Sequence, residues 1–154
     1  MILGSALKSR KYPIAISILA LLAGGSFYLF LRNGDFIFHY WIEAIWPEVQ
    51  INQLILNIPE PGRHYPRWVI YSLPNGLWAL AYTLLITTIW RKQQSFLKYF
   101  WIGTIPILVV GFELLQYAGW VSGTFCTGDL ALGMSGMLLG VLINKAFNHE
   151  QAHA

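Results

Sequence analysis

The sequence predicts an all-α integral membrane protein with four transmembrane helices, forming a single membrane domain over residues 1–154. The chain is 56% hydrophobic and only 11% charged, whereas soluble domains contain about 25% charged residues. Too few charges are present to cover a water-exposed surface. Aromatic residues make up 16% of the chain, which is typical of proteins with many contacts at the membrane–water interface. These observations exclude the disordered, disulfide-stabilised and soluble multidomain classes.

The first predicted span covers residues 13–31. This apolar run is long enough to cross a hydrocarbon core of about 30 Å, and Arg32 ends it. The stretch also has features of a signal peptide, with a weak small-residue cleavage site at residues 23–25. Because the apolar run continues past that site, the sequence favours an uncleaved signal anchor.

Three further apolar stretches predict spans at about residues 73–90, 99–117 and 129–147. In the second span, Pro74 suits the first helical turn, where its missing N–H costs no hydrogen bond, and Ser72 is the expected cap. In the third span, Pro106 leaves one backbone carbonyl without its usual partner, which membrane helices tolerate as a local kink.

The external loop, residues 32–72, is expected to contain an amphipathic helix at the membrane interface over residues 36–46. Asp35, His39 and Glu43 recur every four residues and form a polar stripe beside apolar side chains. This spacing also suits a metal site on one helix face, but an interfacial helix needs a polar stripe in any case. We therefore predict no metal and no cofactor. Arg67, near the end of the loop, is interpreted as a solvated residue, and the alternative is that it reaches down to an acidic pocket.

The distribution of Lys and Arg predicts the orientation. With the N-terminus inside, seven of the ten basic residues lie on the cytoplasmic side and three on the external side. The seven are Lys8, Arg10, Lys11, Arg91, Lys92, Lys98 and Lys145. Basic residues accumulate in cytoplasmic loops, so both termini are predicted to be cytoplasmic. This bias accounts for the basic pI of about 9.1 without any nucleic-acid partner.

Two acidic residues fall where the topology does not require them: Glu113 within the third span and Asp129 at the start of the fourth. A charged carboxylate at mid-bilayer costs about 2.5–3.5 kcal/mol on insertion scales, so both should face protein or water. Gln116 shares a helix face with Glu113, and Asn75 begins the second span on the same side of the membrane. These four residues predict a polar, ligand-binding pocket in the external leaflet. Interaction with a helix dipole and purely structural hydrogen bonds remain open as alternatives.

Three glycines continue the helix face of Asp129, namely Gly133, Gly136 and Gly140. Small residues on one face let two helices approach closely, and the last two glycines form a GxxxG motif. This face is therefore expected to pack against another helix, most plausibly the third span. No catalytic residue is assigned, because the single cysteine, Cys126, has no His or Cys near it in sequence and no catalytic motif occurs.

The segments Glu113-Leu-Leu-Gln116, Asp129 and Gly136 resemble the VanZ-like family, whose name comes from a teicoplanin-resistance protein. The family's members are small bacterial multi-span membrane proteins. They share Glu-x-x-Gln, a short loop, an Asp and a glycine seven residues later. The resemblance extends over residues 72–140 and includes the start of the second span. Gly123 stands where the family usually has Arg, and Gly133 where it usually has Asn, so a divergent member is implied.

The resemblance implies a protein of the bacterial cytoplasmic membrane but carries no settled mechanism. Our leading hypothesis is a non-enzymatic protein of the cell envelope. Its pocket would bind a glycolipid headgroup or glycopeptide, or contribute to glycopeptide tolerance. A second hypothesis is a structural subunit with membrane-protein partners. A third is a membrane-embedded hydrolase or transferase that uses the Glu/Asp pair as acid and base. Membrane lipid is an expected partner under each.

Overall fold

The computed structural model describes residues 2–31, 44–46 and 65–152, and regular structure in these ranges is entirely helical. The elements are α1 (Ile2–Leu31), α4 (Arg67–Tyr71), α5 (Leu73–Ile89), α6 (Phe96–Pro106), η2 (Ile107–Gly111), α7 (Phe112–Tyr117) and α8 (Thr127–Ala152). Four segments are long and apolar enough to cross a membrane: Arg10–Tyr28, Arg67–Ile89, Phe96–Tyr117 and Thr127–Asn148. The predicted all-α class with four spans is confirmed. Almost all of the expected interfacial helix lies outside the described residues, and the cytoplasmic placement of the termini stays a prediction.

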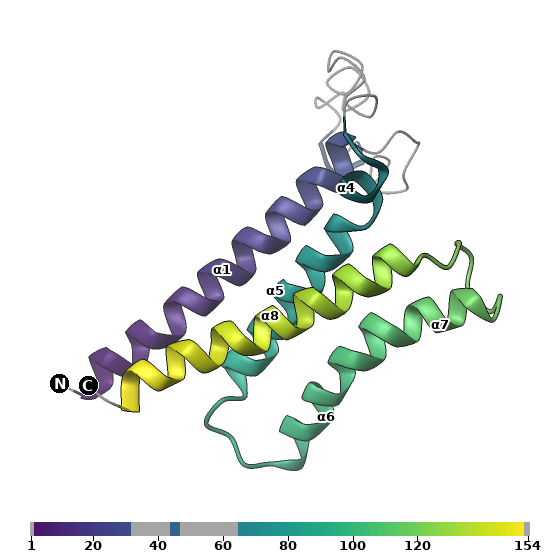
Figure 1. Ribbon diagram of the computed structural model, residues 1–154. Coiled ribbons are helices and arrows are strands. Elements are labelled where there is room, and N and C mark those ends of the chain that lie inside the picture. The colour runs from purple at the N-terminus through teal and green to yellow at the C-terminus, as the bar shows by residue number, and fades with distance from the viewer. Residues whose placement is uncertain (1, 32–43, 47–64, 153–154) are drawn as a thin grey trace.

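Helix α5 lies at the centre of the bundle, with α1 along one side and α8 along the other (Figure 1). Its side chains Thr83 and Leu84 are completely buried. The two ends of the chain lie close together at one end of this bundle. The three helices α1, α5 and α8, called the central trio below, therefore form the packed core of the protein.

Helix α1 packs on α5 through small residues. Pro13, Ser17, Ala20 and Gly24 are buried at intervals of three or four residues and so lie on one helix face. A Cβ atom on Gly24 would lie 2.6 Å from Trp78 Nε1 of α5, so only glycine permits this approach. The segment with the weak cleavage-site pattern is thus packed inside the bundle. The helix also begins well before the predicted start at Pro13.

The second span begins at Arg67, earlier than the predicted start at Leu73. Ser72 was expected to cap the helix, but its backbone is helical and its side chain makes no cap hydrogen bond. Its N–H instead donates to the Trp68 carbonyl at 2.9 Å. The helical path begins directly after Pro66, whose fixed φ suits that position. Pro74 then removes only one hydrogen bond, so the path continues through it.

The third span, formed by α6, η2 and α7, stands apart from the central trio (Figure 1). The irregularity expected at Pro106 takes the form of a π-helical segment that begins at the next residue. A proline that lacks an N–H and a π-bulge both disturb the regular ladder of helical hydrogen bonds. A hydrogen bond of 2.8 Å between Tyr82 Oη and Thr104 Oγ1 links α5 to α6. The span is thus connected to the bundle by few contacts.

The glycine face of α8 packs mainly on the second span, which corrects the predicted partner. A Cβ atom on Gly136 would overlap the Gly76 carbonyl oxygen of α5, and one on Gly140 would lie 2.8 Å from Thr83 Cβ. Only Gly133 faces the third span, where its Cβ would lie 2.9 Å from Val109 Cγ1. A stripe of small residues permits close approach but does not specify the neighbour, and the helix opposite this one is α5.

Candidate functional site

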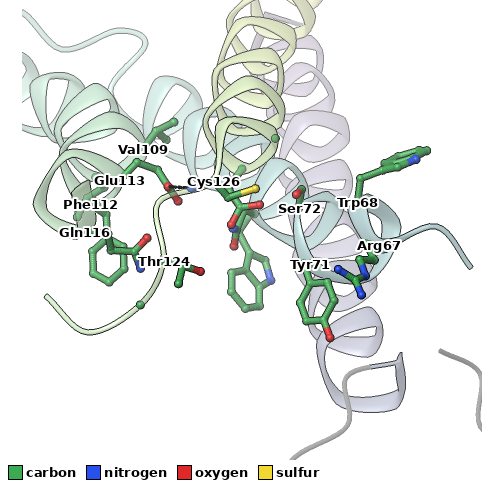
Figure 2. A pocket seen from close by; sticks show the side chains of 16 residues that line it. Arg67, Trp68, Tyr71, Ser72, Val109, Phe112, Glu113, Gln116, Thr124 and Cys126 are labelled. Carbon is green, nitrogen blue, oxygen red and sulfur yellow. Dashed lines mark hydrogen bonds between the residues drawn. The ribbon is translucent and has the colours of Figure 1, made fainter. Parts of the chain in front are cut away.

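A cavity of about 1110 Å³ lies between the start of the second span, the third span and the start of α8 (Figure 2). All four residues predicted from the sequence to form a pocket line it: Asn75, Glu113, Gln116 and Asp129. The other lining residues are Arg67, Trp68, Tyr71, Ser72, Trp78, Leu108, Val109, Phe112, Gly123, Thr124, Cys126 and Gly128. The tertiary structure therefore brings together polar groups from three of the four spans.

Glu113 is buried on α7 and is tied to the segment that precedes α8. Its Oε2 atom accepts a hydrogen bond of 3.2 Å from the backbone N–H of Cys126 (Figure 2). The Cys126 carbonyl in turn accepts the Leu130 N–H at 3.1 Å, in the first turn of α8. The carboxyl group thus holds the beginning of the fourth span against the end of the third. Part of its role is to fix the shape of the cavity wall.

Asp129 lies in the first turn of α8, where the helix dipole favours a negative side chain. Its Oδ1 atom is buried and has no hydrogen-bond partner among the described residues. A buried polar atom without a partner costs about 1–3 kcal/mol, and more if it is charged. No hydrogen bond joins Asp129 to Glu113 within the described part of the chain. The residue as a whole is half-buried and lines the cavity.

Gln116 lies directly against Gly123, the position at which the VanZ-like family usually has Arg. A Cβ atom on Gly123 would overlap the Gln116 side-chain amide. The φ angle of Gly123 is +136°, a conformation that glycine adopts far more readily than other residues. Any larger residue here would strain the backbone and displace Gln116. Glycine at this position is therefore required by the local geometry of the wall.

Arg67 was interpreted as a solvated loop residue, with reach into the acidic pocket as the alternative, and the structure favours the alternative. Arg67 is the first residue of α4 and, although exposed, it lines the cavity. Figure 2 shows Arg67 and Tyr71 on the side opposite Glu113 and Gln116. The cavity therefore combines a guanidinium group with two carboxyl groups. The sequence signal that was available is Pro66, after which a helix can start.

Cys126 also lines the cavity, and its half-buried thiol is free. Sequence reasoning assigned it no role because it lacks a chemical partner nearby in the chain. Thr124 precedes it in the same connecting segment, so a hydroxyl and a thiol lie at this wall (Figure 2). As the single cysteine of the chain, Cys126 is a natural chemical reporter for occupation of the cavity.

A second polar cluster lies at the opposite end of the central trio. The Arg91 guanidinium donates a hydrogen bond to Asn144 Oδ1, which ties the end of α5 to α8. Burial lowers the pKa of Arg91, and the positive charge of Arg10 on α1 lowers it further. This hydrogen bond joins the second span to α8 where the chain leaves that span, close to Arg10 of α1. We assign it a structural role.

No family model, curated protein or solved structure matches this chain. The resemblance to the VanZ-like family therefore stays a prediction from the short motifs around Glu113 and Asp129. The functional argument below is carried by the cavity itself.

Proposed function

We propose that this chain is a non-enzymatic, VanZ-like protein of the bacterial cytoplasmic membrane whose cavity binds the polar head of an envelope or lipid-linked ligand. The observation that carries the proposal is the gathering of Asn75, Glu113, Gln116 and Asp129 from three spans at the wall of one cavity. The cavity volume of about 1110 Å³ is comparable with the about 300–1000 Å³ of small-molecule sites. A cavity with a few convergent polar groups is the form that small-molecule sites usually take.

The lining indicates which chemical groups such a ligand carries. Ionised carboxyl groups accept hydrogen bonds and do not donate them, so Asp129 calls for a hydroxyl or ammonium donor. Arg67 offers several N–H donors, which suit a phosphate or carboxylate group. Trp78 and Phe112 supply flat apolar surfaces. A headgroup with several hydroxyls and an anionic neighbour, as in glycolipids and lipid-linked sugars, matches this combination.

The enzyme hypothesis receives less support from the same geometry. An acid–base pair requires two groups that both reach the reacting atoms, but Glu113 already accepts the Cys126 N–H. The structural-subunit hypothesis draws on the exposed apolar faces of the third span. Such faces are equally suited to lipid, which covers every outward side of a membrane bundle. Binding is therefore the function that the arrangement favours.

The single cysteine allows a direct test of binding. The full chain is placed in phosphatidylcholine nanodiscs, and N-ethylmaleimide labelling of Cys126 is timed with three added lipids. These are glucosyl-diacylglycerol, undecaprenyl-phosphate-linked N-acetylglucosamine and phosphatidylglycerol. We expect at least one of the two sugar lipids to slow labelling. Unchanged labelling with both sugar lipids would contradict the proposal, and protection by phosphatidylglycerol alone would contradict a sugar headgroup.

The substitution Asp129→Asn should weaken this protection about tenfold, because hydrogen bonds to a charged group contribute about 1.5–3 kcal/mol. The matched control is Glu150→Gln, the same chemical change near the other end of α8. Equal protection in wild type and Asp129→Asn would remove Asp129 from the site. An equal loss of Cys126 protection in Asp129→Asn and Glu150→Gln would indicate a general effect of charge instead of a specific contact.

The membrane orientation has a test of its own. The positive-inside rule predicts that the cavity opens on the external side. A membrane-impermeant maleimide should therefore label Cys126 in intact bacterial cells that express the chain. Labelling only after the membrane is permeabilised would reverse the orientation and place the cavity on the cytoplasmic side.

A further inference from the structure

Resting on the proposed binding function, we propose that an apolar groove between α5 and the third span holds a hydrocarbon chain of the lipid-linked ligand. The ligand then reaches the cavity sideways from the membrane. The groove has a volume of about 260 Å³. Its lining residues are Asn75, Trp78, Ala79, Tyr82, Leu108, Val109 and Gly133.

The groove is continuous with the polar cavity. Four residues line both: Asn75, Trp78, Leu108 and Val109. Along α5 the lining continues from these shared positions to Ala79 and Tyr82, which lie deeper in the second span. A molecule whose head occupies the cavity can therefore extend a tail into the groove without crossing a wall.

Specific contacts delimit the groove on two sides. At its deep end, the hydrogen bond of 2.8 Å between Tyr82 Oη and Thr104 Oγ1 joins α5 to α6. On the α8 side, Gly133 and Val109 approach closely, since a Cβ on the glycine would lie 2.9 Å from Val109 Cγ1. These contacts attach the third span to α5 and to α8, and the groove lies beside them.

The position of the groove determines what occupies it. It lies inside segments long and apolar enough to cross a membrane, and the hydrocarbon region of a bilayer contains no bulk water. The lining is predominantly apolar in its deeper part, where Ala79 and Leu108 face it. A hydrocarbon chain is the component of the surrounding membrane that fits this environment, and its attached headgroup would lie at the polar cavity.

The test locates the hydrocarbon chain by photocrosslinking. The full chain in phosphatidylcholine nanodiscs receives glucosyl-diacylglycerol or phosphatidylcholine, each with a diazirine in mid acyl chain, and crosslinked residues are mapped by mass spectrometry. We expect the sugar lipid to label groove residues such as Ala79 and Leu108 several-fold more than phosphatidylcholine does. The undecaprenyl-linked sugar with a diazirine in its chain replaces glucosyl-diacylglycerol if it alone protects Cys126.

The variant Ala79→Leu fills the groove from α5 and should abolish this enrichment, because Ala79 lines the groove and not the polar cavity. Ala118→Leu is the matched control, because Ala118 is exposed and lines neither space. Soluble glucosylglycerol, which has the headgroup without the tail, should slow labelling of Cys126 equally in wild type and Ala79→Leu. If the variant loses the crosslinks from the sugar lipid but keeps the protection of Cys126 by glucosylglycerol, the result supports a hydrocarbon chain in the groove.

The outcomes separate this inference from the proposed function. If soluble glucosylglycerol protects Cys126 but crosslinks are no more frequent in the groove than at Leu114, which is exposed on the third span and lines neither space, the groove proposal is overturned and the binding function stands. If the groove is labelled equally by both lipids and Asp129→Asn changes nothing, the groove accepts any membrane chain and the binding function is overturned. Crosslinks of the lipid to a copurifying protein instead of to the groove residues would also overturn the inference.

Discussion

The central trio and the third span are built by different means. Half of the residues in the most apolar window of the second span are buried, against 11% in the third. In the trio, glycines and other small residues let backbones touch, as at Gly136 against Gly76. The third span carries large outward side chains such as Phe100 and Trp101. It meets the rest of the protein through a few polar contacts instead of a continuous interface.

This difference explains where the cavity lies. Lipid tails are as apolar as Leu, so membrane helices gain little from burying large apolar residues and associate through small residues and hydrogen bonds. In the trio, small residues bring the helices together along their length. In the third span, such contacts with the other helices occur only at a few places. One wall of the cavity is therefore firmly packed and the other is attached by individual contacts. The predictions below test this contrast, beginning with the largest expected effect.

Gly136→Leu should disrupt the trio. The new side chain would overlap the backbone of Gly76, which cannot move aside as a flexible side chain can. Overpacking typically costs about 1–3 kcal/mol of stability, and more where the backbone must move. We therefore expect a loss of about 3 kcal/mol or a failure to fold. Thermal unfolding in mild detergent measures the loss. The control is Gly25→Leu, because nothing lies within 4 Å of a Cβ at Gly25; similar losses in both variants would refute the packing argument.

Glu113→Leu should detach the start of α8 from the third span. The substitution leaves the Cys126 N–H without its acceptor, which costs about 1–3 kcal/mol if the group stays buried. Glu113→Gln keeps an oxygen acceptor and should retain most of the stability. The measurements are the unfolding temperature and the maleimide reactivity of Cys126. Equal stability of the two variants would show that this hydrogen bond does not hold the wall.

Pro106→Ala should alter the cavity more than the fold. Alanine restores the backbone N–H that proline lacks and removes the clash with the preceding turn, directly before η2. A regular helix would then rotate Glu113 relative to Cys126, so ligand protection of Cys126 should fall several-fold. Because few contacts hold this span, stability should change by less than about 1 kcal/mol. A large loss of stability with protection unchanged would indicate that the third span is packed as firmly as the trio.

Tyr82→Phe should have the smallest effect. It removes the hydrogen bond to Thr104, and hydrogen bonds between membrane helices contribute about 0.6 kcal/mol on average. Tyr99→Phe on the third span is the control, since Tyr99 is exposed and makes no hydrogen bond among the described residues. The free energies of unfolding of Tyr82→Phe and Tyr99→Phe should differ by about 0.6 kcal/mol. A loss above about 2 kcal/mol would mean that this contact alone holds the third span.

Some of the site could be predicted because its chemistry is unusual for its place in the chain. Glu113 and Asp129 are carboxylates in or beside apolar stretches, and such residues are costly there. Helix geometry and topology predicted that Gln116 and Asn75 lie near these two carboxylates. The structure places all four residues at one cavity. Cys126 was missed as a lining residue, and contact of Arg67 with the pocket was only an alternative, because neither residue is unusual in a loop. Only the three-dimensional position of these two residues relative to the spans shows that they line the cavity.

The sequence by itself determined the four spans and the irregularity at Pro106, because the length of an apolar run and the lack of an N–H are local properties. It also located the glycine face of α8. The tertiary structure alone decided that this face meets α5, that α4 extends the second span and that the third span stands apart. A stripe of small residues permits approach to any complementary helix, and the choice depends on how all four spans fill space together. Because α8 packs on α5, no helix contacts the third span along its whole length, and the cavity lies in the space that remains.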